Sequence, residues 1–159
     1  MLDISPGTKI DTALAKLEGA LAKGDVDAAA NLFQADCYWR DLVTFTWNLK
    51  TLEGREQVRD MLSSQLAATK PSNFVQDTRE AASEAGGVTE GWFEFETGVA
   101  RGYGHIRLKD GLIWTLLTTM TELSIAKPHH PVTLWFPGLL LTAAIAAAAS
   151  WLAQQPVVT

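Results

Sequence analysis

The chain has 159 residues and a formal net charge of −5, and its 13 lysines and arginines are scattered along the sequence. This length suits one domain around one hydrophobic core, and the lack of a basic patch argues against a nucleic-acid partner. The single cysteine, Cys37, excludes a disulfide within the chain, and the amino terminus has no apolar run typical of a signal peptide. We therefore expect a cytoplasmic protein with no nucleic-acid partner.

Apolar residues recur at helical spacing in several segments of the first half of the chain. Residues 8–23 predict an amphipathic helix that a capping box at Thr8 opens and Gly24 ends. A shorter helix follows, capped by Asp25. After an aromatic strand, Gly54 opens a third helix with a buried apolar stripe. The amino-terminal part is therefore predicted to contain three helices.

From Asn73 the apolar pattern changes to a period of about two residues, which predicts successive strands. The pair Asp110 and Gly111, between two extended runs, indicates a hairpin. Glycines within strands mark bends, and three are found where two strands would meet: Gly98, Gly102 and Gly104. Three helices across a bent antiparallel sheet predict an α+β cone with a cavity between helices and sheet.

Aromatic and charged residues are concentrated between Asp36 and Arg55. Alternate residues of a strand point to opposite sides, and both sides of this strand carry a charge beside an aromatic ring. The mixture favours a concave surface with polar groups set into an aromatic wall. A strand whose Trp39 lies in the core and whose charges pair at its rim gives the same pattern, so both interpretations stay open.

The run from Leu112 to Leu123 carries apolar residues on both sides, with Trp114 and Thr118 on the same side. A central strand that faces a cavity on one side and a partner on the other shows this pattern, which predicts a homodimer through the sheet. Extra covering elements within the chain are the alternative. We also expect Trp39, Trp47 and Trp114 to be mostly buried, because strands normally hide such large rings.

Two sets of candidate site residues follow from these patterns. A carboxylate and a histidine that share a pocket can move a proton, so the catalytic candidates are Asp36, Asp41 and His105. The predicted binding residues for a small apolar or aromatic molecule are Tyr38, Trp39, Asp41, Trp47, His105, Trp114 and Thr118. His129 and His130 are adjacent and lack further ligands at metal spacing, so no metal site is expected.

The order of these elements resembles the nuclear-transport-factor-2-like fold, which is also called cystatin-like and includes ketosteroid isomerase and polyketide cyclases. Two segments are more specific: LFQADCYWRDLVTFTWNLKTLEGREQV and FEFETGVARGYGHIRLKDGLIWTLLTTMTEL. They resemble the small domain that precedes the FAD and NADPH domains in a group of flavin-containing monooxygenases. The resemblance covers about residues 8–123 and implies an accessory domain with a flavoprotein as partner. This sequence has no GxGxxG motif, so we expect neither FAD nor NADPH in this chain.

The composition changes after residue 125, which predicts a domain over residues 1–125 and an apolar tail over residues 126–159. The run from Val132 to Leu152 has no charged residue and is long enough to span a bilayer. Pro137 and Gly138 interrupt it, and no basic residue follows it. A membrane anchor, a packed helix and a loosely held tail are the alternatives. We favour a cytoplasmic protein, with membrane association through residues 132–152 as the alternative.

Two functions fit the sequence. The first is a binding module that holds a small apolar molecule or serves assembly, as an accessory of a flavin monooxygenase system. The second is a free-standing isomerase, dehydratase or cyclase, in which a pocket Asp and His pair moves a proton while aromatic groups stabilise an oxyanion. We favour the first, because the resemblance explains the aromatic strand without a catalytic role.

Overall fold

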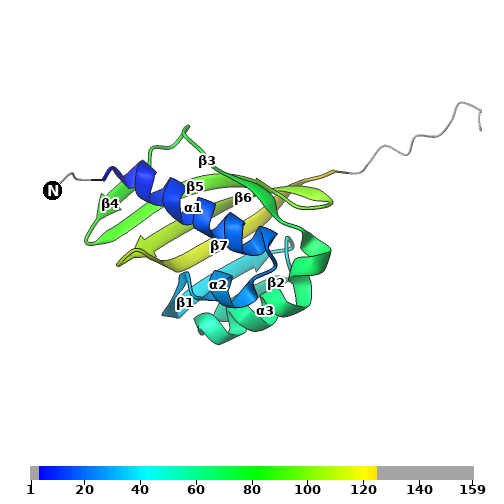
Figure 1. Ribbon diagram of the computed structural model, residues 1–159. Coiled ribbons are helices and arrows are strands. Elements are labelled where there is room, and N and C mark those ends of the chain that lie inside the picture. The colour runs from blue at the N-terminus through cyan, green and yellow to red at the C-terminus, as the bar shows by residue number, and fades with distance from the viewer. Residues whose placement is uncertain (1–3, 125–159) are drawn as a thin grey trace, which may run out of the picture. The chain divides into compact units, whose positions relative to one another are not determined.

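A computed structural model describes residues 4–124 of the chain (Figure 1). Contacts between residues divide the chain into residues 1–125 and 126–159. The predicted tail, residues 126–159, lies outside the described residues, and so do its uncharged run 132–152 and the histidines at 129 and 130.

Three helices form where the apolar spacing predicts them. α1 spans Pro6–Ala22, α2 spans Val26–Ala30 and α3 spans Gly54–Thr69. α1 begins earlier than predicted because its cap is Ser5, whose hydroxyl accepts a hydrogen bond from the Thr8 N–H at 3.3 Å. The two long helices bury the predicted stripes, which are Ile10, Leu14, Leu17 and Leu21 in α1 and Val58, Met61, Leu62 and Leu66 in α3.

Seven strands form one curved sheet in the order β2-β1-β7-β6-β5-β3, with β4 beside β5. They are β1 (Phe33–Leu42), β2 (Leu49–Glu53), β3 (Ser72–Gln76), β4 (Ser83–Ala85), β5 (Val88–Glu96), β6 (Ala100–Lys109) and β7 (Leu112–Leu123). The predicted α+β fold with its curved sheet and amino-terminal helices is confirmed. One difference is that β1 and β7 are parallel, since the chain crosses over through α3 and the other strands before β7 joins β1.

The two faces of this sheet have different surroundings. Figure 1 shows α1 running across one face, with α2 and α3 near β1 and β2. We call this the helix face and the opposite side the open face. Because side chains alternate along a strand, each strand contributes residues to both faces.

Aromatic rings fill the space between the helices and the helix face. Trp39 stacks on Phe33 with ring centroids 5.6 Å apart and meets the Phe45 ring edge-on at 4.9 Å. The packing continues across the sheet through three further rings, those of Phe95, Phe74 and Phe93. The sequence predicts a cavity between helices and sheet, and these side chains occupy the middle of that space.

Of the three tryptophans expected to be buried, Trp39 lies in this core with 1% of its surface exposed. Trp47 is 59% exposed, so the expectation is wrong for this residue. It belongs to the loop 43–48, where the chain leaves the sheet between β1 and β2. A ring in such a loop has no neighbouring strand to cover it.

Trp114 lies partly buried on the open face and does not share a side with Thr118, contrary to the alternation predicted for β7. The register explains the difference, because two consecutive β6 residues pair with Thr115 and Ile113. Trp114 is therefore an extra residue, and such a bulge moves the residues before it to the other side of the strand. The guanidinium of Arg107 lies over the Trp114 ring, 5.0 Å from its centroid.

Candidate functional site

The fold separates the predicted site residues into different surroundings. Trp39, Asp41 and Thr118 lie together, buried on the helix face. The open-face residues are Tyr38, His105 and Trp114. Asp36 is exposed on β1, and Trp47 is exposed in the loop 43–48. The catalytic candidates Asp41 and His105 are on opposite sides of the sheet and do not form a pair.

The Asp41 carboxylate is fully buried and accepts four hydrogen bonds. One oxygen accepts from the Thr118 hydroxyl at 2.7 Å. The other accepts from the N–H groups of Phe45 and Thr46 at 3.0 and 2.8 Å, and from the Thr46 hydroxyl at 2.9 Å. Because neither oxygen is exposed and the carboxylate lines neither of the clefts described below, a bound substrate cannot reach it to transfer a proton. The arrangement assigns Asp41 the role of holding the loop 43–48.

Trp39 and Thr118 complete this network. The indole N–H of Trp39 donates to the Thr118 hydroxyl at 2.9 Å, and that hydroxyl donates onward to Asp41. Both polar groups are therefore satisfied within the core, as buried polar groups usually are. The three predicted ligand-binding residues on this face contact one another and the loop, and they line none of the clefts described below.

On the open face, three rings from neighbouring strands form a cluster. Trp92 of β5 stacks on Tyr103 with centroids 5.3 Å apart and contacts the His105 ring at 4.5 Å. Burial lowers the pKa of His105, and the nearby Glu90 carboxylate opposes this shift. His105 is therefore a neutral packing residue at pH 7. Trp92 was not predicted, although its place in the alternating run VTEGWFEFE would have indicated this face.

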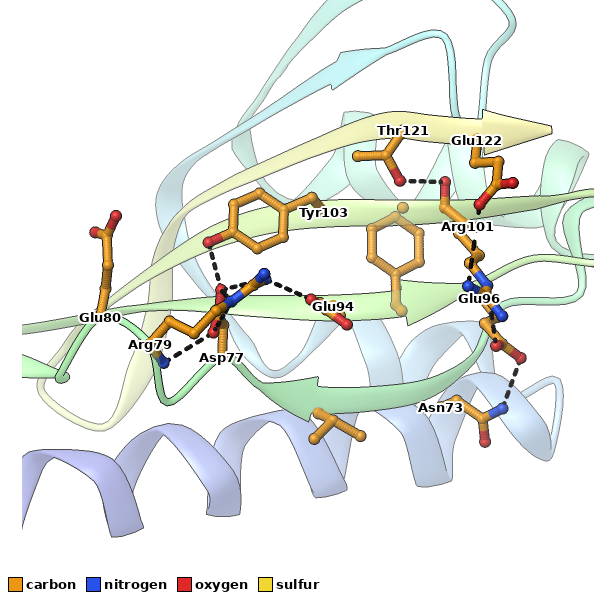
Figure 2. A pocket seen from close by; sticks show the side chains of 13 residues that line it. Asn73, Asp77, Arg79, Glu80, Glu94, Glu96, Arg101, Tyr103, Thr121 and Glu122 are labelled. Carbon is orange, nitrogen blue, oxygen red and sulfur yellow. Dashed lines mark hydrogen bonds and ion pairs between the residues drawn. The ribbon is translucent and has the colours of Figure 1, made fainter.

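A groove of about 970 Å³ crosses the β3 side of the open face (Figure 2). One of its lining residues is Asp77, which accepts from the Tyr103 hydroxyl at 2.7 Å and from the Arg79 guanidinium at 2.8 Å. Arg79 also pairs with Glu94 at 2.6 Å. Figure 2 shows these side chains pointing toward one another, with Glu80 apart from them.

These contacts strongly shift the pKa values of Asp77 and Tyr103. The Arg79 side chain and N–H, together with the Tyr103 hydroxyl, hold the pKa of the Asp77 carboxyl well below its usual range. Burial and the Asp77 carboxylate raise the pKa of Tyr103 to about 12. A charged acid already paired with an arginine and a tyrosine that keeps its proton cannot exchange a proton near pH 7. The group therefore ties the segment after β3 to β6. Sequence patterns do not indicate it, because Asp77 and Tyr103 meet only through the fold.

A second cleft of about 550 Å³ lies between α1, the α2–β1 connection and the β6–β7 hairpin. We call it the α1 cleft. Its rim includes the ion pair between Lys9 and Glu84, at 2.6 Å. The apolar side chains that line it are Ile4, Ala13, Leu32, Leu108, Leu112 and Ile113. It contains none of the predicted ligand-binding residues, because those lie on the open face, in the Asp41 network or in the loop 43–48.

No group of three potential metal ligands occurs among residues 4–124. None of the helices described by the structure is both long enough and apolar enough to cross a membrane.

Comparison with known proteins gives one family match. The model of the SnoaL-like domain matches residues 14–116, which is more than half of the chain. No curated protein sequence matches the chain.

Solved structures with the same fold share little sequence with this chain. An NTF2-like protein with a cystatin-like fold from Novosphingobium aromaticivorans has a TM-score of 0.54 and 11% identity, over 79% of this chain and 86% of that one. A Bacillus subtilis protein proposed to be an isomerase has a TM-score of 0.54 and 15% identity, over 74% and 90%. A Xanthomonas campestris protein proposed to be a calcium/calmodulin-dependent protein kinase II association domain has a TM-score of 0.56 and 16% identity, over 72% and 86%.

Proposed function

The chain belongs to the SnoaL-like domain family, and from this premise we propose that it is a binding domain for a small apolar molecule, without a catalytic centre of its own. The observation that carries the proposal is that Asp41 is fully buried and accepts four hydrogen bonds from within the fold. A proton-transfer enzyme needs an acid or base that a bound substrate can reach. The isomerase-type alternative, which the Bacillus subtilis neighbour would favour, depends on a pocket Asp and His pair, and the sheet separates Asp41 from His105.

The α1 cleft is where we place the ligand. Its volume of about 550 Å³ falls within the usual range for small-molecule sites, and its lining is largely apolar with a polar rim. Lys9 and Glu84 at that rim neutralise each other, and the other two charges of the lining, Lys16 and Asp110, are of opposite sign. The lining therefore favours an uncharged apolar or aromatic body over an ion.

An Ala13→Trp variant should lose ligand binding, because Ala13 lines the α1 cleft and the larger ring would occupy it. We expect compounds from a small aromatic library to bind the parent chain, and the variant to bind them at least about tenfold more weakly. Saturation-transfer NMR followed by titration measures this. Ala15→Trp is the matched control, since Ala15 is exposed on the same helix. Equal affinity of the parent and the Ala13 variant for these compounds would show that they bind outside the α1 cleft.

The open face supports a second role, assembly as a homodimer. Its centre has partly exposed apolar groups, including Leu117, Trp92 and Tyr38, the last with 46% of its surface exposed. The charges around them differ between two neighbouring strands: β5 contributes Glu90, Glu94 and Glu96, while β6 contributes Arg101, Arg107 and Lys109. Arg107 pairs with Glu90 at 3.2 Å and Arg101 with Glu96 at 3.9 Å within the chain, so the apolar centre is the part of this face that a second copy would cover.

Replacing Leu117 by arginine should therefore reduce the molar mass of the chain in solution by half. Light scattering at micromolar concentration measures this directly. Ala15→Arg on the helix side is the control and should leave the dimer intact. A parent chain that is already monomeric would contradict the assembly role.

The resemblance to flavin-containing monooxygenases extends this proposal to an accessory role in the cytoplasm, with a separate flavoprotein as partner. In such a system the flavin chemistry belongs to the partner. The chain itself is expected to carry no flavin, because a dinucleotide needs a glycine-rich turn at the start of a helix. Copurification of the chain with a flavoprotein would support this extension.

A further inference from the structure

Exposed apolar side chains gather at one end of the sheet. Within residues 4–124, eight large apolar residues are exposed. Five of them belong to three segments, namely the β1–β2 loop with the first residue of β2, the β5–β6 turn and the end of β7: Val43, Trp47, Leu49, Val99 and Leu123. We call these five residues the apolar tip.

Strand pairing brings the three segments to the same end. Leu42, at the end of β1, pairs with Leu49 of β2 and with Thr119 of β7. Beyond that point, the Ser124 N–H donates to the Val99 carbonyl at 2.7 Å. Figure 1 shows the end of β7 and the β5–β6 turn on the same side of the molecule as the β1–β2 connection.

The loop 43–48 presents its apolar side chains at a conformational cost. Val43 and Trp47 have φ angles of 58° and 54°, a region that glycine and asparagine normally occupy. Such a backbone conformation is unfavourable for a residue with a side chain and persists only where the surroundings enforce it. Here Asp41 enforces it through three hydrogen bonds to Phe45 and Thr46. The hydrogen bonds to Asp41 thus keep the side chains of Trp47 and Val43 exposed to water. An unfavourable arrangement that is maintained in this way indicates that their exposure serves a function.

The composition of the apolar tip and its surroundings fits a lipid surface. Tryptophan favours the interface between lipid headgroups and acyl chains, and aliphatic side chains beside it add buried area. Lys50 follows Leu49, and the Lys70 side chain lies near Gly98 of the β5–β6 turn. Neither lysine forms an ion pair within the part of the chain that the structure describes, so both can meet anionic headgroups.

The position of Ser124 adds a further argument. The described chain ends there, within the tip, and the sequence that follows has no charged residue from Val132 to Leu152. A few exposed side chains bind a bilayer weakly, and stable attachment generally takes a second signal. An apolar continuation from this end would supply it.

We propose that the apolar tip is a membrane-surface contact, in which Trp47, Leu49 and Leu123 enter the headgroup region of a bilayer. This surface is separate from the α1 cleft and from the centre of the open face. The outcome for this proposal therefore does not depend on whether the α1 cleft binds a ligand or the open face forms a dimer.

The test compares the full chain with a Trp47→Ser, Leu49→Ser double variant. Cosedimentation with vesicles of phosphatidylcholine and phosphatidylglycerol (3:1) gives the partition coefficient of each. We expect the double variant to partition at least about tenfold more weakly, because two apolar side chains no longer enter the lipid. Val75→Ser is the matched control, since Val75 is 62% exposed on β3 and does not belong to the tip.

Three outcomes would overturn the proposal. The first is that the parent chain does not bind the vesicles. The second is that the double variant binds as well as the parent, which would mean that the sequence after residue 124, and not the apolar tip, attaches the chain to the membrane. The double variant could also lower the molar mass of the chain without lipid, which would make the tip a contact between copies. A second measurement guards against misfolding: Trp47→Phe should keep most of the binding but lose part of the fluorescence quenching by brominated lipid.

Discussion

Replacement of Asp41 by alanine is expected to lower the free energy of unfolding by about 3 to 5 kcal/mol. The change removes the acceptor of four hydrogen bonds and leaves the Thr118 hydroxyl hydrogen and the Phe45 N–H buried without an acceptor. Each buried donor without a partner costs about 1 to 3 kcal/mol. The loop 43–48 would also lose the contacts that hold Val43 and Trp47 at positive φ. Denaturant unfolding followed by circular dichroism measures the effect.

Two variants sharpen this test. Asp36→Ala is the matched control, because Asp36 is exposed on the same strand and should change the stability by less than about 0.5 kcal/mol. Asp41→Asn keeps the shape but replaces one acceptor oxygen with a donor, so an intermediate loss is expected. If Asp41→Ala unfolded at the denaturant concentration of the parent, Asp41 would not hold the loop. Its assignment as a free acid or base would then be open again.

Replacement of Gly104 by alanine should cost about 3 kcal/mol or more, for a steric reason. A Cβ on Gly104 would lie 2.3 Å from the Phe93 ring and 2.5 Å from the Leu117 carbonyl oxygen. The ring is packed against other aromatic rings of the core, and the carbonyl belongs to the neighbouring strand. Neither can move away without breaking packing or strand pairing. Thermal unfolding of the purified variant measures the loss.

Gly19→Ala is a control variant that should raise the stability of the protein, whereas Gly104→Ala should lower it. Gly19 lies within α1, and a Cβ there would meet nothing within 4 Å. Alanine in a helix interior is favoured over glycine by up to about 1 kcal/mol, so this variant should be more stable than the parent. A Gly104 variant with the stability of the parent would show that the space between β6 and the Phe93 ring is open, and that a ligand could enter the core.

The sequence by itself determined the elements and the class of fold. The apolar stripe of α1 needs only a period of 3.6 residues, and the turn at Asp110 and Gly111 needs only two residues that tolerate positive φ. Both signals come from residues close together in the chain. For the same reason the alternation in β1 correctly placed Trp39 and Asp41 on one side and Tyr38 on the other.

The make-up of the site was decided only by the tertiary structure. Alternation gives two sides for each strand, but it does not state which side faces the helices or how neighbouring strands are aligned. The parallel register of β1 and β7 sets Asp41 opposite Thr118, and the bulge at Trp114 turns that ring to the open face. His105, one residue from the helix-facing Gly104, therefore points away from Asp41. Pairing between distant segments determines which polar groups meet, and a local pattern carries no information on that pairing.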